Sequence, residues 1–233
     1  MKSSDVLFKI KNGLIVSCQA RVGWAMYGTE IMASFAKAAE EGGAVGIRAT
    51  GPDNIKAIKE KINLPIIGIN KVWTEGSDVY ITPTYESAKE ILDKGIEIIA
   101  IDATQRKRPG NETFEEIIFK IRINYPDVLI MGEISTIEEA NNVKDLNIDL
   151  ISTTLSGYTK ESSEIKTVNL ELISKIKNIT DKPIICEGKV SSSKDAIDAF
   201  KAGAFSVVVG TSITRPEVIT KRFVEDIKSA LTE

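Results

Sequence analysis

The residues best suited to chemistry in this sequence stand where short apolar runs end. Each of those ends carries a polar side chain or a glycine. Along the chain they are Gln19, Arg48, Lys71, Asp102, Glu133, Thr153 with Thr154, Glu187, and Gly210 with Thr211. A single polar end indicates only that a strand stops there. Eight such ends predict one functional mouth, because the carboxyl ends of parallel barrel strands converge.

The sequence contains no histidine. This excludes Ser-His-Asp and Cys-His catalysis and every metal site that depends on imidazole. General acid–base work must then fall to lysine, glutamate, aspartate, tyrosine or cysteine. No imidazole is available as a metal ligand, and we expect no metal site.

Lys71 is the first candidate for a base, and Glu187 for an acid. Lys71 follows the apolar run IIGIN, and burial or the nearby charge of Arg48 would lower its pKa so that it can act as a neutral amine. The alternative is an ordinary solvated lysine. Glu187, in IICEGK, is expected on the same rim, where it could serve as an acid or simply pair with Lys71 or Arg48.

Glycines near the end of the chain suggest a phosphate site. Gly210 and Thr211 end the last apolar run, and a helix is expected to start near Arg215. Gly188 follows the run before it. Backbone N–H groups in these places commonly bind phosphate in barrels, and a guanidinium would add a bidentate contact.

Three other groups of residues have a structural and a functional interpretation. The basic run 106–108 is a solvated loop or borders an anionic substrate. Cys18 and Cys186 lie in apolar runs and are interpreted as core residues rather than nucleophiles. Trp24 and Trp73 are expected in loops, where they could cover a ligand or pack.

Apolar strand-like runs alternate with amphipathic segments along the whole chain. The expected strands are Leu14–Cys18, Ala44–Arg48, Pro65–Ile69, Glu97–Asp102, Val128–Glu133, Asp149–Thr153, Pro183–Glu187 and Phe205–Gly210. The expected helices are Glu30–Glu41, Ile55–Lys61, Tyr85–Lys94, Phe114–Tyr125, Ile137–Leu146, Asn169–Ile179, Lys194–Lys201 and Pro216–Leu231. Eight such units predict a single (β/α)₈ barrel domain over residues 1–233, rather than an open sheet of five or six strands.

Composition narrows the partners and the compartment. With 30 basic and 33 acidic residues the net charge is −3, which argues against nucleic-acid binding. No apolar run is long enough to span a membrane, and the start of the chain lacks the apolar core of a secretory signal. Two cysteines are too few for a disulfide framework, so we expect the reducing cytoplasm.

Seven segments together resemble the N-acetylmannosamine-6-phosphate 2-epimerase family. They are LIVSCQA (14–20), GGAVGIRA (42–49), LPIIGINK (64–71), IAIDATQRKRP (99–109), STTLSGYT (152–159), IICEGK (184–189) and ITRPEVITKRF (213–223). The resemblance runs nearly end to end. It implies a phosphate-binding (β/α)₈ barrel without a redox cofactor, a homodimer, a phosphorylated amino-sugar substrate and a place in sialic-acid catabolism.

The resemblance also implies roles for particular residues. Lys71 matches the lysine that removes and returns the C2 proton, and Glu187 the glutamate that assists ring opening or polarises C1. The residues that would bind substrate are Gln19, Arg48, Glu133, Thr153, Gly188, Gly210, Thr211 and Arg215. Four departures from the family pattern are Glu133 for aspartate, Lys189 for arginine, Thr211 for glycine, and Val72-Trp73 where a basic residue usually follows the lysine.

Two other functions remain compatible with these residues. A barrel lysine can attack a carbonyl, so Lys71 could form a Schiff base in an aldolase or lyase. A phosphosugar sensor without turnover would keep the phosphate site, and the change at Glu133 is its only support. Solvent deuterium at C2 of the sugar would favour epimerisation, whereas an adduct trapped by borohydride would favour a lyase.

Overall fold

Eight parallel strands close into a barrel in the order of the chain, as predicted. The computed structural model describes residues 2–231. The strands are β1 (Leu14–Cys18), β2 (Gly46–Thr50), β3 (Ile66–Ile69), β4 (Ile98–Asp102), β5 (Leu129–Glu133), β6 (Leu150–Ser152), β7 (Ile184–Cys186) and β8 (Ser206–Val209). β8 pairs with β1, which removes any free sheet edge.

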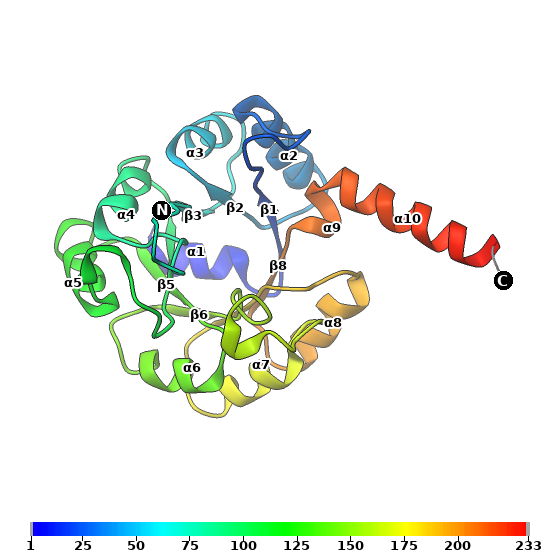
Figure 1. The fold of residues 1–233 in the computed structure, drawn as a ribbon. Helices are drawn as coiled ribbons and strands as arrows, with labels where there is room; N and C mark the ends of the chain where they lie inside the picture. The colour runs from blue at the N-terminus through cyan, green and yellow to red at the C-terminus, as the bar shows by residue number, and fades with distance from the viewer. Residues whose placement is uncertain (1, 232–233) are drawn as a thin grey trace.

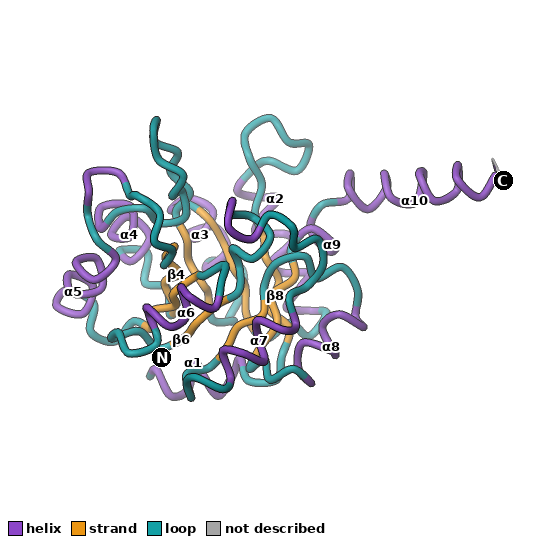
Figure 2. The backbone as a smooth tube through the Cα atoms, turned by 60° about the horizontal axis from the view of Figure 1, so that its bottom comes forward, coloured by secondary structure: helices purple, strands orange, loops and turns teal. Residues whose placement is uncertain are grey.

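Helices surround the strands, as Figure 2 shows. They are α1 (Ser3–Ile10), α2 (Thr29–Glu41), α3 (Pro52–Lys59), α4 (Tyr85–Leu92), α5 (Phe114–Asn124), α6 (Ile137–Val143), α7 (Leu170–Lys177), α8 (Ser193–Lys201), α9 (Thr211–Thr214) and α10 (Pro216–Leu231), with 3₁₀ turns at Pro109–Asn111 and Lys160–Ser162. A capping box begins α6, since Thr136 accepts from the Glu139 N–H and Glu139 accepts from the Thr136 N–H. No helix within residues 2–231 is long and apolar enough to cross a bilayer.

The apolar core has two layers, separated by the strands. Alternate strand residues, such as Val16 and Ile47, face the surrounding helices. The others, such as Ile15 and Ile67, fill the barrel interior. This division follows from the strand period of two residues, and it determines which side chains reach the mouth.

The first helix was not predicted from the sequence. Val6 and Ile10 of α1 are buried in the same cluster as the residues of the barrel interior. Ile10 lies against Gly46 at the start of β2, and Figure 1 shows α1 across the barrel. The only sequence signal was the four-residue spacing of Val6 and Ile10 in a helix of eight residues.

Most predicted boundaries differ from the observed ones by one to three residues. The largest difference in a strand is in β2, which starts and ends two residues later than expected. Arg48 therefore lies inside the strand rather than at its end. α3 begins three residues earlier, at Pro52, a residue well suited to the first turn. The short α9 was also not predicted.

Candidate active site

A cavity of about 960 Å³ opens at the carboxyl ends of the strands. Eight of the ten predicted site residues line it: Gln19, Arg48, Lys71, Glu187, Gly188, Gly210, Thr211 and Arg215. The other two, Glu133 and Thr153, are not in the lining. The cavity therefore brings together the candidate base, the candidate acid and the candidate anion site.

The strand alternation explains which side chains enter this cavity. Ile67 and Ile69 of β3 face the interior, and Lys71 continues their row beyond the strand end. In the sixth strand, Leu150 faces the interior and Ile151 faces the helices. Thr154 therefore enters the cavity, whereas Thr153 does not, a distinction that the strand period would have given.

Arg48 is buried between two carboxylates. Its Nη2 lies 2.6 Å from Oε1 of Glu133, and its Nη1 lies 3.1 Å from Oε1 of Glu187. Glu133 has no exposed surface, so it supports Arg48 from below the cavity floor. Both Arg48 Nε and Glu133 Oε2 are buried without a hydrogen-bond partner among the described residues.

Glu187 has a pKa near neutrality. Burial raises the pKa of its carboxyl to about 7, with a further increase from the negative charge of Glu133, although Arg48 opposes both. The Thr154 hydroxyl donates to Glu187 Oε2 at 3.2 Å, and Thr153 Oγ1 donates to the Glu187 carbonyl at 2.9 Å. Thus the carboxyl is held in place and can exist in either protonation state near pH 7.

Lys71 lies in the cavity wall as a partly buried amine. Its backbone pairs with Ile81, so that the segment after β3 folds back on itself, and its N–H donates to Thr50 Oγ1 at 3.3 Å. Burial, followed by the positive charge of Arg48, lowers the pKa of Lys71 to about 8. Among the described residues, none forms an ion pair or hydrogen bond with its Nζ. A solvated surface lysine would not have its pKa lowered by burial in this way.

The predicted anion site has glycine where a side chain would obstruct it. Gly188 has φ +100°, and a Cβ there would lie 3.4 Å from the Thr154 carbonyl oxygen. Gly210 lies close to Ser17, and α9 begins at Thr211. The N–H groups of Ile213 and Thr214 donate to the Gly210 carbonyl, whereas those of Thr211 and Ser212 have no acceptor among the described residues and so can bind an anion. Arg215 is also in the lining, although its Nε donates to Glu217 at 2.7 Å.

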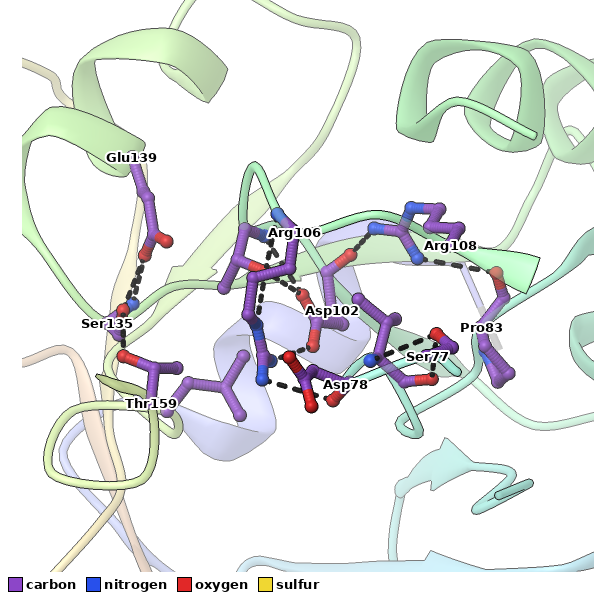
Figure 3. A network of polar contacts seen from close by, with 12 residues as sticks. Ser77, Asp78, Pro83, Asp102, Arg106, Arg108, Ser135, Glu139 and Thr159 are labelled. Carbon is purple, nitrogen blue, oxygen red and sulfur yellow. Dashed lines mark hydrogen bonds and ion pairs between the residues drawn. The ribbon is translucent and has the colours of Figure 1, made fainter. Parts of the chain in front are cut away.

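The basic run 106–108 is mainly structural. Figure 3 shows Arg106 directed at Asp102, with Nη2 2.6 Å from Oδ2, and its Nη1 on the Asp78 carbonyl at 3.0 Å. Arg108 is buried and donates to the carbonyls of Asp102 and Pro83. Asp102, which was expected at the mouth, instead pairs with Arg106 and does not line the cavity.

Several lining residues were not among the predicted site residues. Three of them, Tyr80, Tyr158 and Arg21, lie in loops beyond the strand ends. Polar residues at the ends of apolar runs indicate only the strand ends themselves, so this pattern gave no sign of them. Burial raises the pKa of both tyrosines, which keeps them protonated hydrogen-bond donors. Trp24 and Trp73 also line the cavity. Cys18 and Cys186 are free and buried, in agreement with their predicted place in the core.

A closed eight-stranded barrel with a cavity at the carboxyl ends of its strands defines the (β/α)₈ class, whose enzymes have their active sites in this position. The family described as "Putative N-acetylmannosamine-6-phosphate epimerase" matches residues 32–229. Relatives named "Putative N-acetylmannosamine-6-phosphate 2-epimerase" include one from Caldanaerobacter subterraneus subsp. tengcongensis, 48% identical over 96% of this chain and 94% of its own length. One from Clostridioides difficile is 45% identical over 96% of this chain and 99% of its own.

A solved structure gives the same result. The N-acetylmannosamine-6-phosphate 2-epimerase from Clostridium perfringens superposes with a TM-score of 0.91 at 42% identity, covering 94% of this chain and 95% of that one. The chain therefore belongs to the N-acetylmannosamine-6-phosphate 2-epimerase family, and it is an isomerase.

Proposed function

We propose that this protein interconverts N-acetylmannosamine 6-phosphate and N-acetylglucosamine 6-phosphate by lysine-mediated proton transfer at C2. The observation that carries the proposal is the presence of Lys71 and Glu187 in one cavity with pKa values of about 8 and about 7. An acid and a base with such values can both be in the required form near neutral pH. The relatives' names supply the substrate class.

In the proposed mechanism, Lys71 takes the C2 proton of the open-chain sugar. That proton is acidic because C2 adjoins the aldehyde carbon, and its removal gives an enolate. Glu187, in its protonated form, donates to the oxygen on C1 where negative charge develops. Return of a proton to the opposite face of C2 inverts the centre. For Lys71 to deliver it, the enolate must turn relative to the amine while the phosphate stays bound.

The remaining predicted residues receive supporting roles. We assign the phosphate to the backbone at Gly188, Gly210 and Thr211, with Arg215 beside it. Gln19 donates to Ser17 Oγ at 2.6 Å and keeps Oε1 without a partner among the described residues, so this oxygen can accept a substrate hydroxyl or amide N–H.

Glu133 and Thr153, which do not line the cavity, would act on the substrate through other residues. Glu133 orients Arg48, and Thr153 holds the backbone of Glu187. In this arrangement the additional methylene of Glu133, relative to aspartate, changes the position of Arg48 rather than a direct contact with the sugar. Glutamate in place of aspartate at position 133 would therefore affect substrate preference through the position of the Arg48 guanidinium.

We further propose that the enzyme is a cytoplasmic homodimer in amino-sugar and sialic-acid catabolism. The free, buried thiols of Cys18 and Cys186 suit a reducing compartment. α10 supports the dimer because it extends away from the barrel in Figure 1 and buries none of its residues. Phe223, Ile227 and Leu231 form an apolar stripe on this helix, and a second copy would cover it.

Proton NMR of the purified protein with N-acetylmannosamine 6-phosphate in D₂O tests the reaction. We expect the gluco epimer to form with deuterium at C2, without added metal or nucleotide. Formation of the epimer without solvent deuterium would contradict exchange at a lysine amine. Failure to form any epimer, with a folded protein and an active control enzyme, would contradict the reaction itself.

A Schiff-base mechanism is tested separately by borohydride. Reduction in the presence of the sugar phosphate, followed by mass spectrometry, would leave a stable adduct on Lys71 in an aldolase or lyase. We expect no adduct, because the proposed mechanism uses the amine only as a base.

A further inference from the structure

The rim of the cavity carries a row of aromatic and cationic side chains. The guanidinium carbon of Arg21 lies 5.6 Å from the centroid of the Trp24 ring and 5.1 Å from that of Trp73. Trp73 stacks on Tyr80, with 5.6 Å between ring centroids and an interplanar angle of 7°. Arg215 lies over Trp24 at 3.8 Å. All five side chains line the cavity.

This row joins three segments that are far apart in the sequence. Arg21 and Trp24 belong to the segment between β1 and α2, Trp73 and Tyr80 to the segment after β3, and Arg215 to the junction of α9 and α10. The two tryptophan rings therefore restrict where the Arg21 side chain can lie. Since Trp24 contacts both Arg21 and Arg215, the two cations share one ring beside the proposed phosphate anchor.

Arg21 differs from Arg48 and Arg215, two other arginines of the cavity, in its partners. Arg48 contacts Glu133 and Glu187, and Arg215 contacts Glu217. Within residues 2–231, no acidic side chain pairs with Arg21, and none of its N–H groups has a hydrogen-bond acceptor. Cation–π contacts with rings occupy none of the N–H donors of a guanidinium, so these donors stay available for an anion. The positive charge of Arg21 also contributes to the lowered pKa of Lys71, which indicates that it acts within the site.

We propose that Arg21, oriented by Trp24 and Trp73, is a substrate-binding residue for the phosphate group of the sugar. The inference rests on the proposed function, because it takes a phosphorylated amino sugar as the ligand. Two oxygens of a tetrahedral phosphate dianion can accept together from the planar guanidinium, and the phosphate would supply the negative partner that Arg21 lacks in the protein. Arg21 would thereby favour phosphorylated over unphosphorylated sugars.

Calorimetric titration of Arg21→Gln tests this proposal. The ligand is N-acetylmannosamine 6-phosphate brought to equilibrium with its epimer, so that turnover adds no heat. We expect the Kd to rise about five- to tenfold, as for loss of a partly exposed charge-assisted contact. Steady-state assays should show a similar rise in KM with kcat nearly unchanged. Lys107→Gln, which removes an exposed positive charge outside the lining, is the matched control and should leave Kd unchanged.

Tryptophan fluorescence gives a second measurement, because Trp24 and Trp73 are the two tryptophans of the chain. Binding of the phosphorylated sugar should change the emission of the wild type because the phosphate offsets the positive charge that lies over both rings, and Arg21→Gln should lose most of this change. The unphosphorylated sugar at equal occupancy should produce little change in either protein.

Three results would overturn the proposal. One is an unchanged Kd in Arg21→Gln, and another is equal weakening for the phosphorylated and unphosphorylated sugars, which would indicate a purely structural role. A fall in kcat with constant KM would mean that Arg21 acts on the proposed base Lys71 and does not bind the phosphate. A wild type that binds the phosphorylated sugar without turnover would contradict the proposed function alone. A wild type that does not bind it would contradict both.

Discussion

Arg48 and the two carboxylates that it contacts, Glu133 and Glu187, form a cluster of three charged groups. Removing a charge from water costs several kcal/mol, and a buried ion pair often adds no net stability compared with apolar residues of the same volume. With both carboxylates ionised, Glu133, Glu187 and Arg48 would also carry a net negative charge inside the barrel. The pKa of Glu187 rises to about 7 in this setting. The cluster is therefore better explained by function than by stability.

Replacement of Lys71 by alanine tests the base directly. Because the other residues of the cavity would remain, we expect turnover to fall by at least about a thousandfold while the Kd for the sugar phosphate stays within tenfold. Deuterium exchange at C2, measured by NMR, should be lost together with turnover. Substantial exchange in Lys71→Ala would show that another group removes the proton.

The pH dependence follows from the two shifted groups. Lys71 must be neutral, so activity falls as the pH decreases below its pKa of about 8. Glu187 must be protonated, so activity falls as the pH increases above its pKa of about 7. Only a fraction of the enzyme molecules has a neutral Lys71 and a protonated Glu187 at the same time, and this fraction is largest between the two pKa values. Because these are the pKa values of the free enzyme, a profile of kcat/KM with its maximum between about pH 7 and 8 is expected.

Glu133→Gln should move this maximum to lower pH. The charge of Glu133 raises the pKa of both Glu187 and Lys71, so its removal lowers both. The amide keeps the size of the side chain, and Arg48 retains Glu187 as a partner. Measuring kcat/KM against pH for both proteins checks the shift. A loss of activity that is equal at every pH would instead indicate that the variant only misplaces Arg48.

At the scale of elements, the α1 helix is expected to stabilise the barrel from its amino-terminal side. Ile10 is fully buried among residues of the barrel interior, whereas 83% of Phe8 on the same helix is exposed. Ile10→Ala should lower the free energy of unfolding by about 2–4 kcal/mol, and Phe8→Ala should change it by less than about 0.5 kcal/mol. Urea unfolding followed by circular dichroism measures both. Equal effects of the two substitutions would mean that α1 does not close the barrel.

The sequence predicted the elements well where local pattern decides structure. Eight apolar runs and the helices between them led to the closed barrel, and the ends of those runs led to eight lining residues. It failed where packing decides. α1 is helical because the barrel interior accepts Val6 and Ile10. The choice of Thr154 over Thr153 in the cavity, by contrast, follows from the strand alternation and could have been predicted.

The rim of the site shows the same limit. Arg21 and Trp73 meet although 52 residues separate them, and no local pattern relates the two positions. The loops that bring them together have no repeating spacing from which a contact could be read. Such contacts become visible only when the barrel places the ends of β1 and β3 on one face.

For the whole molecule, the remaining question is what covers α10. The exposed fractions of Phe223, Ile227 and Leu231 are 61%, 57% and 81%, and their four-residue spacing places them along one side of the helix. An apolar stripe on a helix that leaves its own barrel is unfavourable in water unless another surface covers it. The proposed homodimer supplies that surface from a second, identical chain.

Sedimentation velocity at micromolar concentration tests the dimer. We expect the wild type to sediment as a dimer and Ile227→Glu to shift toward monomer, because a charge at the centre of the stripe would be buried without a partner. Lys221→Glu, a similarly exposed charge change on the same helix, is the control and should remain dimeric. A monomeric wild type would contradict the dimer. A dimer unaffected by Ile227→Glu would place the interface on another surface and leave the apolar stripe of α10 unexplained by self-association.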